Sequence, residues 1–346
     1  MSKSFGKLPA GESLIRIQNS PNYRNGAFQN ISETKMMADN TSYSDMMLEF
    51  LGKGIDRKPT TLLPAIRTDL RKLSGDLPVL VWFGHSSYLL HINGKNILID
   101  PVFSRRASPF QFIGIKSYEV TNPYTVDNMP DIDLLIITHD HYDHLDYTTM
   151  KSLKTKVKKV CTTLGVGTHL RFWGFSENII SEFDWWDSET VIPGIQLTSV
   201  PARHFSGRTL TRNKTLWSAF VLKTTQHSLY LGGDSGYDEN MFRDIGNKCG
   251  PFDLALLECG QYNTMWPSIH MMPEETVKAS VLLKAKALLP VHWGKFTLSL
   301  HPWYEPIERV VDYAAKAGVE IVTPMIGERV IVGESYPNAA WWELQV

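Results

Sequence analysis

The sequence contains few cysteines and no long apolar run. Its three cysteines, Cys161, Cys249 and Cys259, form no CxxC pair. This argues against a disulfide framework or a zinc ribbon and suits a reducing compartment. No stretch is apolar enough to serve as a signal peptide or a transmembrane segment. We therefore expect a cytoplasmic protein with, at most, peripheral contact to a membrane.

The chain also lacks an excess of one charge. Its 346 residues include 35 basic and 36 acidic side chains, for a formal net charge of -1. This balance gives no overall attraction to nucleic acid, so a nucleic-acid partner is not expected and nuclease activity is disfavoured. With 43% hydrophobic and 21% charged residues, the chain can build a large core, which excludes a mini-protein and a mostly disordered polypeptide.

The character of the sequence changes near residue 78. Residues 1–77 are polar and interrupted by proline and glycine, which predicts an N-terminal extension packed on a main domain of residues 78–346. The main domain begins with β-rich runs, and Asn93-Gly94 between two of them is a strong hairpin signal. Later apolar runs alternate with helical patterns such as residues 273–285. This alternation favours an α/β sandwich of two mixed sheets.

The clearest chemical signal is the pattern HxHxDH, which follows the apolar run 132–138. In an extended segment His139 and His141 project to the same side and can hold one metal ion. Asp143 and His144 follow as the chain turns, so they point elsewhere. Imidazole and carboxylate groups at this density are costly to bury unless a cation organises them. The cluster therefore predicts ligands for two metal ions held side by side.

Two coordination spheres need more donors than this motif supplies. His204, Asp234 and His292 each follow an apolar run further along the chain. A buried strand delivers the loop after it to one edge of its sheet, which is where a site would form. A single strand-end histidine is weak evidence, but together the three residues complete a coherent set of candidate ligands.

These motifs resemble the metallo-β-lactamase superfamily. Within it, the neighbouring segments resemble the N-acyl-phosphatidylethanolamine-hydrolysing phospholipase D branch and its bacterial relatives. The segments that carry this resemblance are 82–87, 100–109, 139–146, 201–204, 233–237, 269–275 and 291–296. The resemblance covers residues 78 to 305, approximately.

The resemblance implies a four-layer αβ/βα sandwich with outer helices and a dinuclear metal site, which usually holds zinc but accepts other divalent metals. One Zn²⁺ would be held by His139, His141 and His204. The other would be held by Asp143, His144 and His292, with Asp234 bridging the two ions. Both ions would share a hydroxide that attacks the substrate.

The same resemblance assigns catalytic roles. His270 matches a histidine that in this branch lies beside the metals and contacts the substrate phosphate. It would stabilise the leaving oxygen or the charge of the transition state. Asp143 and His270 are therefore the expected catalytic residues. From its sequence context alone, the less favoured alternative for His270 is a surface or capping residue before a helix.

Four further residues have two interpretations each. His85 and Asp100, near the ends of adjacent predicted strands, either orient a metal ligand or make a structural hydrogen bond. Tyr262 and Trp266, on the segment leading to His270, either bind substrate at an entrance or belong to the core.

By resemblance, the expected reaction is phospholipase D type hydrolysis that releases an N-acylethanolamine and phosphatidic acid. A phosphodiesterase needs cationic help at the phosphate, for which His270, Arg203 and Lys295 are candidates. The same ligands would serve a lactonase or another carbonyl-directed hydrolase, and a non-catalytic metal-binding protein is a further alternative. The expected partners are a phospholipid or small-molecule substrate, a membrane surface and, from the branch, a second copy in a homodimer.

Overall fold

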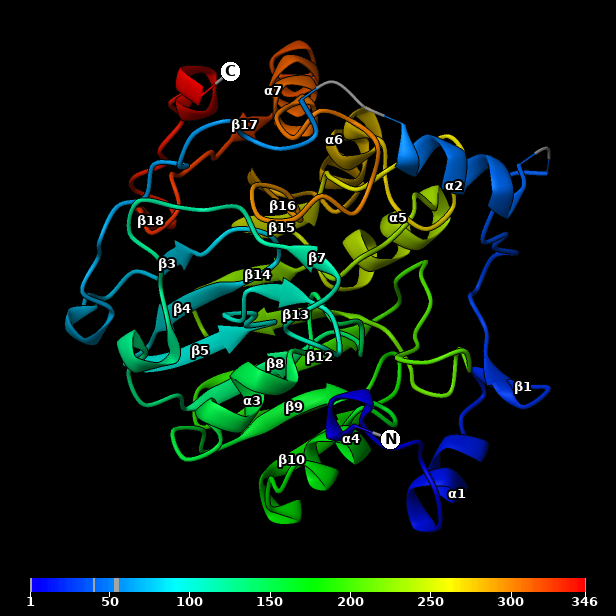
Figure 1. Ribbon diagram of the computed structural model, residues 1–346. Helices are drawn as coiled ribbons and strands as arrows, with labels where there is room; N and C mark the ends of the chain where they lie inside the picture. Colours follow the sequence, from blue (N-terminus) through cyan, green and yellow to red (C-terminus); the bar gives the residue numbers. More distant parts are fainter. Residues whose placement is uncertain (1, 40, 53–55, 346) are drawn as a thin grey trace.

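The computed structural model describes residues 2–39, 41–52 and 56–345. Two seven-stranded sheets face each other, and helices cover their outer faces (Figure 1). Across the first sheet the strands are β10 (Ile180–Phe183), β9 (Val160–Thr163), β8 (Leu134–Ile137), β5 (Lys95–Ile99), β4 (Tyr88–Ile92), β3 (Val79–Trp82) and β18 (Arg329–Ile331). Across the second they are β11 (Ser188–Ile192), β12 (Ile195–Val200), β13 (Ala219–Lys223), β14 (Ser228–Leu231), β15 (Leu254–Glu258), β16 (Ala287–Val291) and β17 (Glu320–Ile321).

Both sheets are mixed. In the first, neighbouring strands from β5 through β8 and β9 to β10 pair in parallel, whereas β18, β3, β4 and β5 pair antiparallel. In the second, β11 to β14 pair antiparallel and β14 to β17 pair in parallel. This arrangement confirms the predicted α/β sandwich of two mixed sheets.

Helices complete four layers. On the first sheet lie α3 (Tyr147–Leu153) and α4 (Gly167–Phe172), and on the second lie α5 (Glu239–Lys248), α6 (Pro273–Leu282) and α7 (Glu305–Ala317). Strand β3 serves both cores: Leu80 and Trp82 pack toward the second sheet, whereas Val79 and Val81 pack toward α3 and α4. Alternate residues of a strand point to opposite faces, so a sheet buried on both faces reads as a continuous apolar run.

Local sequence signals explain several element boundaries. Asn93 and Gly94 join β4 to β5 with φ values of 51° and 69°, as the predicted tight hairpin requires. Helix α6 begins at Pro273, whose fixed φ suits a first helical turn. The predicted helix 273–285 ends early, at Leu282, and Lys284 just beyond adopts a left-handed backbone with φ of 59°.

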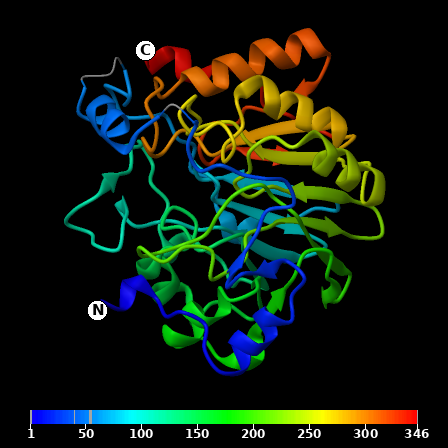
Figure 2. The same ribbon diagram turned by 90° about the vertical axis from the view of Figure 1, so that its right-hand side faces the viewer.

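The first 77 residues run across the sandwich. Their elements are η1 (Lys3–Phe5), α1 (Glu12–Gln18), β1 (Tyr23–Arg24), β2 (Ala27–Phe28), α2 (Tyr43–Leu51) and η2 (Leu70–Lys72). In Figure 2 this blue segment passes from the lower layers upward to α2. Near its start, Lys7 N donates to His169 Nδ1 at 3.0 Å, and further on Leu63 N donates to Glu119 O at 2.9 Å.

Four other short elements lie in connecting loops: β6 (Arg106–Ala107), β7 (Ile115–Lys116), η3 (Val126–Asn128) and η4 (Glu177–Ile179). The last element, η5 (Trp341–Gln345), follows β18 near the end of the described residues. None of the helices in the described part of the chain combines the length and the apolar character that a bilayer-spanning segment requires.

Candidate metal centre

The candidate ligands meet where strands of both sheets end. His139 follows β8, His204 follows β12, Asp234 follows β14 and His292 follows β16. Loops from the two sheets converge at this edge of the sandwich (Figure 1). The structure thus brings together all seven residues that the sequence analysis expects to bind metal, in two groups that are described next. Asp234 and His292 also form a third cluster of potential ligand atoms with Glu258 and His270.

One group consists of His139, His141, His204 and Asp234, whose potential ligand atoms lie within 4.8 Å of one another. His141 Nδ1 lies 3.0 Å from His139 Nε2 and 3.2 Å from His204 Nε2. Asp234 Oδ2 is 3.7 Å from the Nε2 atoms of both His139 and His204. Three imidazole nitrogens and one carboxylate oxygen at this spacing suit one metal ion.

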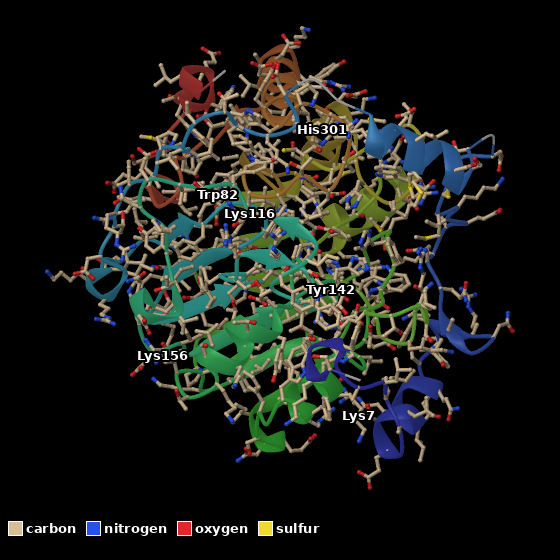
Figure 3. The ribbon with its side chains drawn as sticks, in the orientation of Figure 1. Lys7, Trp82, Lys116, Tyr142, Lys156 and His301 are labelled. Carbon is tan, nitrogen blue, oxygen red and sulfur yellow. The ribbon has the colours of Figure 1, made fainter. Side chains whose placement is uncertain are left out.

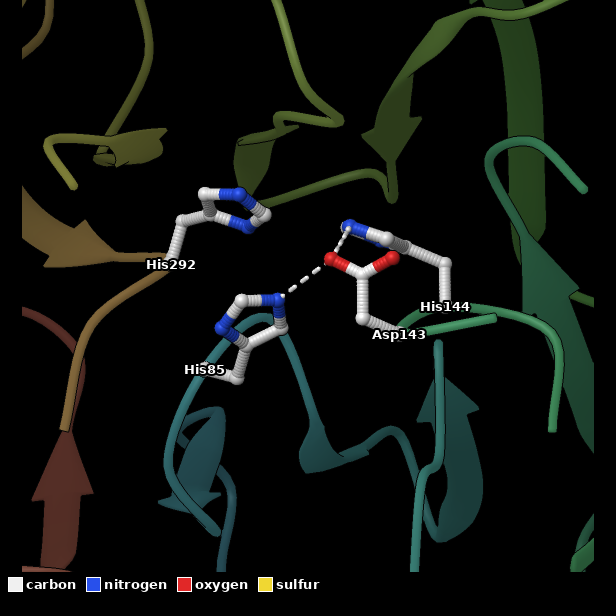
Figure 4. Close-up of side chains that lie close together, drawn as sticks. All are labelled: His85, Asp143, His144 and His292. Atoms are coloured by element: carbon white, nitrogen blue, oxygen red, sulfur yellow. Dashed lines mark hydrogen bonds and ion pairs between the residues drawn. The ribbon is translucent and has the colours of Figure 1, made fainter. Parts of the chain in front are cut away.

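The second group consists of Asp143, His144 and His292, together with His85 (Figure 4). Asp143 Oδ2 lies 3.6 Å from His144 Nε2 and 2.8 Å from His85 Nε2. Asp234 Oδ1 is 3.1 Å from His144 Nε2 and 3.1 Å from His292 Nδ1. Asp234 therefore approaches one group with each of its oxygens, which is the position that a bridging ligand needs.

Several buried atoms of this centre lack a well-formed hydrogen bond. Within the described residues they include His144 Nε2, His292 Nε2 and Asp234 Oδ1. Buried polar atoms are normally satisfied in folded proteins, so these atoms require a further partner. A divalent cation fits, because imidazole nitrogen and carboxylate oxygen are its ordinary protein ligands.

Burial and charge also favour a cation here. Burial holds the pKa values of His139, His204 and His292 well below the ordinary histidine value, so these rings are neutral and can offer a lone pair. Burial opposes the charged form of His144 too, yet the carboxylates of Asp234 and Asp143 raise its pKa well above the ordinary value. The centre thus carries negative charge that a metal ion would balance.

Neighbouring groups fix which nitrogen of an imidazole faces the centre. Asp100, buried just after β5, accepts hydrogen bonds from His144 Nδ1 at 2.8 Å, Thr138 N at 2.9 Å and Thr138 Oγ1 at 2.6 Å. His204 Nδ1 donates to the Ile269 carbonyl at 2.9 Å. In both rings the bonded Nδ1 leaves Nε2 for a metal ion. His85 and Asp100 therefore both contact candidate ligands.

Three residues of the centre have a strained backbone. His85, Asp100 and His292 have φ values of 55°, 39° and 69°, in a region that residues with a side chain rarely adopt. Such strain persists where the surroundings impose it, and it is concentrated at functional sites. Tight packing is one cause at His292, since a Cβ on Gly260 would lie 2.3 Å from the His292 carbonyl oxygen.

His270 lies beside the centre and is paired with a residue that the sequence analysis missed. Its Nδ1 is 2.6 Å from Glu258 Oε2, and its ring stacks on His292 with 5.2 Å between the ring centres. Burial disfavours a charge on His270, but the Glu258 carboxylate outweighs this and raises the pKa of His270 to about 9. The available signal was an acidic residue at the end of the apolar run 254–257, the same pattern that marked the metal ligands.

A cavity of about 340 Å³ opens onto the centre, and its lining includes His270 and several candidate ligands. The apolar part of the lining consists of Met36, Met37, Met46, Phe205, Trp266, Ile269 and Leu298. Arg212 adds a cation to the lining, and its guanidinium carbon lies 5.3 Å from the centre of the Phe205 ring. The sequence analysis missed Arg212 and the methionines because they lie outside the motifs, and no local pattern marks them.

Of the two aromatic residues expected at the entrance, Trp266 lines the cavity, whereas Tyr262 lies elsewhere. The Tyr262 hydroxyl donates to Glu305 at 2.6 Å on helix α7. Its ring stacks on His301, which is labelled in Figure 3, with 4.6 Å between the ring centres. These contacts favour the alternative interpretation of Tyr262 as a packing residue.

Two of the three cations expected near a phosphate are engaged with backbone carbonyls. Arg203 Nη1 donates to Tyr237 O at 2.9 Å, and Lys295 Nζ donates to Val102 O at 2.6 Å. Neither residue is in the lining of the cavity, whereas His270 is. Arg203 and Lys295 therefore hold loops together instead of facing the cavity.

The N-terminal extension contributes to the centre. Asn30 Nδ2 donates to His204 O at 2.8 Å, and Asn30 Oδ1 accepts from His204 N at 3.0 Å. Met36 and Met46 pack on the buried side chain of Trp266 and its neighbours. The extension therefore supports a ligand-bearing loop and forms part of the cavity wall, which its composition did not indicate.

Comparisons with known proteins agree with this geometry. The family model described as "Beta-lactamase superfamily domain" matches residues 95–293. An uncharacterized protein of Mycobacterium tuberculosis is 40% identical over 97% of this chain and 92% of its own length. N-acyl-phosphatidylethanolamine-hydrolyzing phospholipase D 1 of Caenorhabditis elegans is 32% identical over 67% of this chain and 68% of its own length.

Among solved structures, a metallo hydrolase of the archaeon Ignicoccus hospitalis matches with a TM-score of 0.56 and 21% identity, over 73% of this chain and 97% of its own. This likeness bears on the fold alone. Together with the family match and the metal-ligand groups, it agrees with the resemblance drawn from the motifs, including its branch. The chain therefore belongs to the metallo-β-lactamase superfamily of metal-dependent hydrolases.

Proposed function

We propose that this protein is a dinuclear zinc-dependent phosphodiesterase of phospholipase D type that acts on N-acyl-phosphatidylethanolamine-like lipids. The observation that carries the proposal is the cavity, in which an apolar wall and two cationic groups, His270 and Arg212, lie next to the ligand groups. A phosphodiester lipid presents the matching chemistry, since its acyl chains are apolar and its reacting group is an anion.

The ligand arrangement supports two metal ions. Asp234 approaches both ligand groups, and imidazole nitrogens dominate the donor set, which is typical of zinc. When bound, two such cations lower the pKa of a water molecule and clamp the oxygens of an in-line displacement. The ion held by the first group would have His139, His141 and His204 as ligands, and that of the second group Asp143, His144 and His292.

The side chains of the cavity have separate roles in this proposal. Arg212 attracts the anionic phosphodiester, and His270 stabilises the oxygen that leaves. Methionines suit a wall that accepts acyl chains of different shape, because their side chains are flexible and polarisable. A lactone is neutral, so it would not need both His270 and Arg212 as cations, and it would not need a long apolar wall. These features favour a phosphodiester over a lactone as the substrate.

A lipid substrate also requires access to a membrane. On α2, next to Met46 of the cavity wall, Met47 and Leu48 are 64% and 68% exposed. Leu210, two residues before Arg212, is fully exposed. These three side chains adjoin cavity-lining residues in the sequence, and exposed apolar patches are typical of surfaces that contact lipid. We infer that this rim rests on the membrane while a lipid enters the cavity. The name of the nematode relative supports the same substrate class.

The experiment is hydrolysis of N-acyl-phosphatidylethanolamine by metal-quantified protein, with an aryl phosphodiester and a lactone as comparison substrates. His139→Ala should abolish release of the N-acylethanolamine, because it removes a ligand. His227→Ala is the matched control, since His227 lies in the turn between β13 and β14, outside both ligand groups. Turnover of the lactone alone would refute the phosphodiesterase assignment, and turnover of the aryl diester without the lipid would refute the lipid assignment.

A further inference from the structure

We propose that Glu258 is the positioning residue of His270, which it orients so that Nε2 can donate a proton to the leaving oxygen of the substrate. This inference rests on the proposed phosphodiesterase function and assigns a role to a residue outside the two ligand groups described above. Glu258 and His270 also form a third cluster of potential ligand atoms with Asp234 and His292. Its basis is the 2.6 Å contact between Glu258 Oε2 and His270 Nδ1, at the edge of the cavity.

Glu258 is itself held firmly. It ends β15 and is only 1% exposed. Its Oε1 accepts hydrogen bonds from Ser235 N at 3.1 Å and Met271 N at 3.0 Å, and its backbone carbonyl accepts from Thr276 Oγ1 at 2.8 Å. Glu258 thus joins the loop after Asp234 and the loop of His270 through its carboxylate, and the first turn of α6 through its backbone carbonyl. A carboxylate fixed by two backbone N–H groups can hold a ring in one orientation.

The two carboxylate oxygens of Glu258 have different partners, which distinguishes a structural role from a positioning role. A glutamine could replace Oε1 as the acceptor of the two backbone N–H groups. It could not replace Oε2, because its NH₂ group donates where His270 Nδ1–H also needs to donate. A buried carboxylate is costly where a neutral amide would satisfy the backbone. Only the contact with His270 requires the negative charge.

The two ring nitrogens of His270 then have different partners. Nδ1–H is committed to Glu258, and Nε2–H is left for a group in the cavity, which His270 lines. As a water oxygen forms a new bond to phosphorus and gives up one of its protons to solvent, the bond from phosphorus to the leaving alcohol oxygen breaks. The Nε2–H bond breaks at the same time, its electron pair stays on the ring, and the proton forms the O–H bond of the alcohol. Solvent then restores the proton on Nε2.

The first test compares leaving groups in the full-length, metal-loaded protein. Paired phosphodiesters share the same phosphoryl part and carry either an alkyl alcohol, which needs a proton to leave, or an aryl alcohol, which does not. Glu258→Gln should lower kcat for the alkyl substrate about a hundredfold and that for the aryl substrate only a few-fold, since general acid catalysis contributes about 10²–10⁴. In a His270→Gln background the same substitution should add little further loss.

Glu182→Gln is the matched control. Glu182 is also a buried carboxylate, and its Oε1 also accepts two backbone N–H groups, from Gly165 at 2.7 Å and Gly167 at 3.0 Å. It lies outside the cavity lining, so its substitution should affect both substrates alike. Equal losses on the alkyl and aryl substrates in Glu258→Gln, or a loss of bound metal, would overturn the positioning role.

A second measurement does not depend on turnover. In ¹⁵N NMR spectra of the labelled histidine rings, Nδ1 of His270 should carry a proton in the wild type and lose it in Glu258→Gln. An unchanged His270 spectrum would refute the inference about Glu258. If the wild type hydrolyses neither phosphodiester, the proposed function fails, and the NMR result still decides whether Glu258 orients His270.

Discussion

Replacement of Asp100 by asparagine tests how the fold prepares a metal ligand. Asp100 Oδ1 accepts from Thr138 N, and Oδ2 accepts from both Thr138 Oγ1 and His144 Nδ1. The asparagine oxygen can replace Oδ1. Its NH₂ group would then stand in place of Oδ2 and face two donors. His144 can relieve this conflict by moving its proton from Nδ1 to Nε2, which occupies the atom that should bind metal.

The expected loss of metal affinity follows from the hydrogen bond between Asp100 and His144. Loss of a partner that orients a metal-binding histidine typically costs about 10- to 100-fold in metal affinity, which corresponds to roughly 1.4 to 2.7 kcal/mol. The buried donors left without an acceptor cost the folded protein a further 1 to 3 kcal/mol, approximately. The group that contains His144 should be affected most, because His144 bonds to Asp100 directly. His139 contacts Asp100 only through Thr138 Oγ1, and His204 bonds to the Ile269 carbonyl.

The assay is titration of the metal-free protein with Zn²⁺ in the presence of a competing chelator. The wild type should bind two ions tightly, and Asp100→Asn should bind one of them more weakly. Asp133→Asn is the control, because Asp133 accepts from Asn96 N at 3.0 Å and pairs with Lys158 before β8, away from the ligands. If Asp100→Asn binds both ions with wild-type affinity, Asp100 does not orient His144 as described.

Three further substitutions probe other parts of the protein. Arg212→Gln should raise KM about tenfold for an anionic phosphodiester and leave turnover of a neutral lactone unchanged, as measured by steady-state kinetics. Gly260→Ala should destabilise the protein by roughly 1 to 3 kcal/mol and weaken zinc binding, because a Cβ there meets the His292 carbonyl; thermal unfolding with and without zinc would show both effects. Burial lowers the pKa of Lys295 from 10.5 to about 8, so the unfolded chain binds more protons between these values and stability rises with pH across that window. Lys295→Met should remove this rise in urea unfolding, and an unchanged rise would contradict the assignment to Lys295.

The sequence was sufficient to predict the fold and to indicate the candidate ligands that the structure brings together, because both leave local patterns. A strand buried on both faces needs an uninterrupted apolar run, so a histidine or aspartate just after such a run, such as His292, is conspicuous. The motif from His139 to His144 also fixes the relative directions of its side chains by spacing alone. The spacing of this motif indicated two neighbouring metal ions, whereas the division of all seven candidate ligands between them came from the family resemblance.

Other parts of the site depend on contacts between distant segments. Glu258 ends an apolar run as the ligands do, but only its contact with His270, 12 residues away, shows its role. Arg212 and Asn30 lie in segments without periodicity, where no rule predicts which side chain faces the centre. Arg203 shows the opposite case, in which a residue close to a ligand in sequence does not face the site. It stands next to a ligand in sequence, yet its guanidinium reaches outward to the carbonyl oxygen of Glu33.

Metal binding and part of the substrate cavity depend on different parts of the chain. The seven candidate ligands predicted from the sequence all lie between positions 139 and 292, whereas part of the cavity wall comes from Met36, Met37 and Met46. Under the proposed function, changes in the extension alter which acyl chain fits without changing the groups that perform the chemistry. Exchange of residues 36–46 between related chains should transfer substrate preference as a module, provided that Asn30 and its contact with His204 are kept.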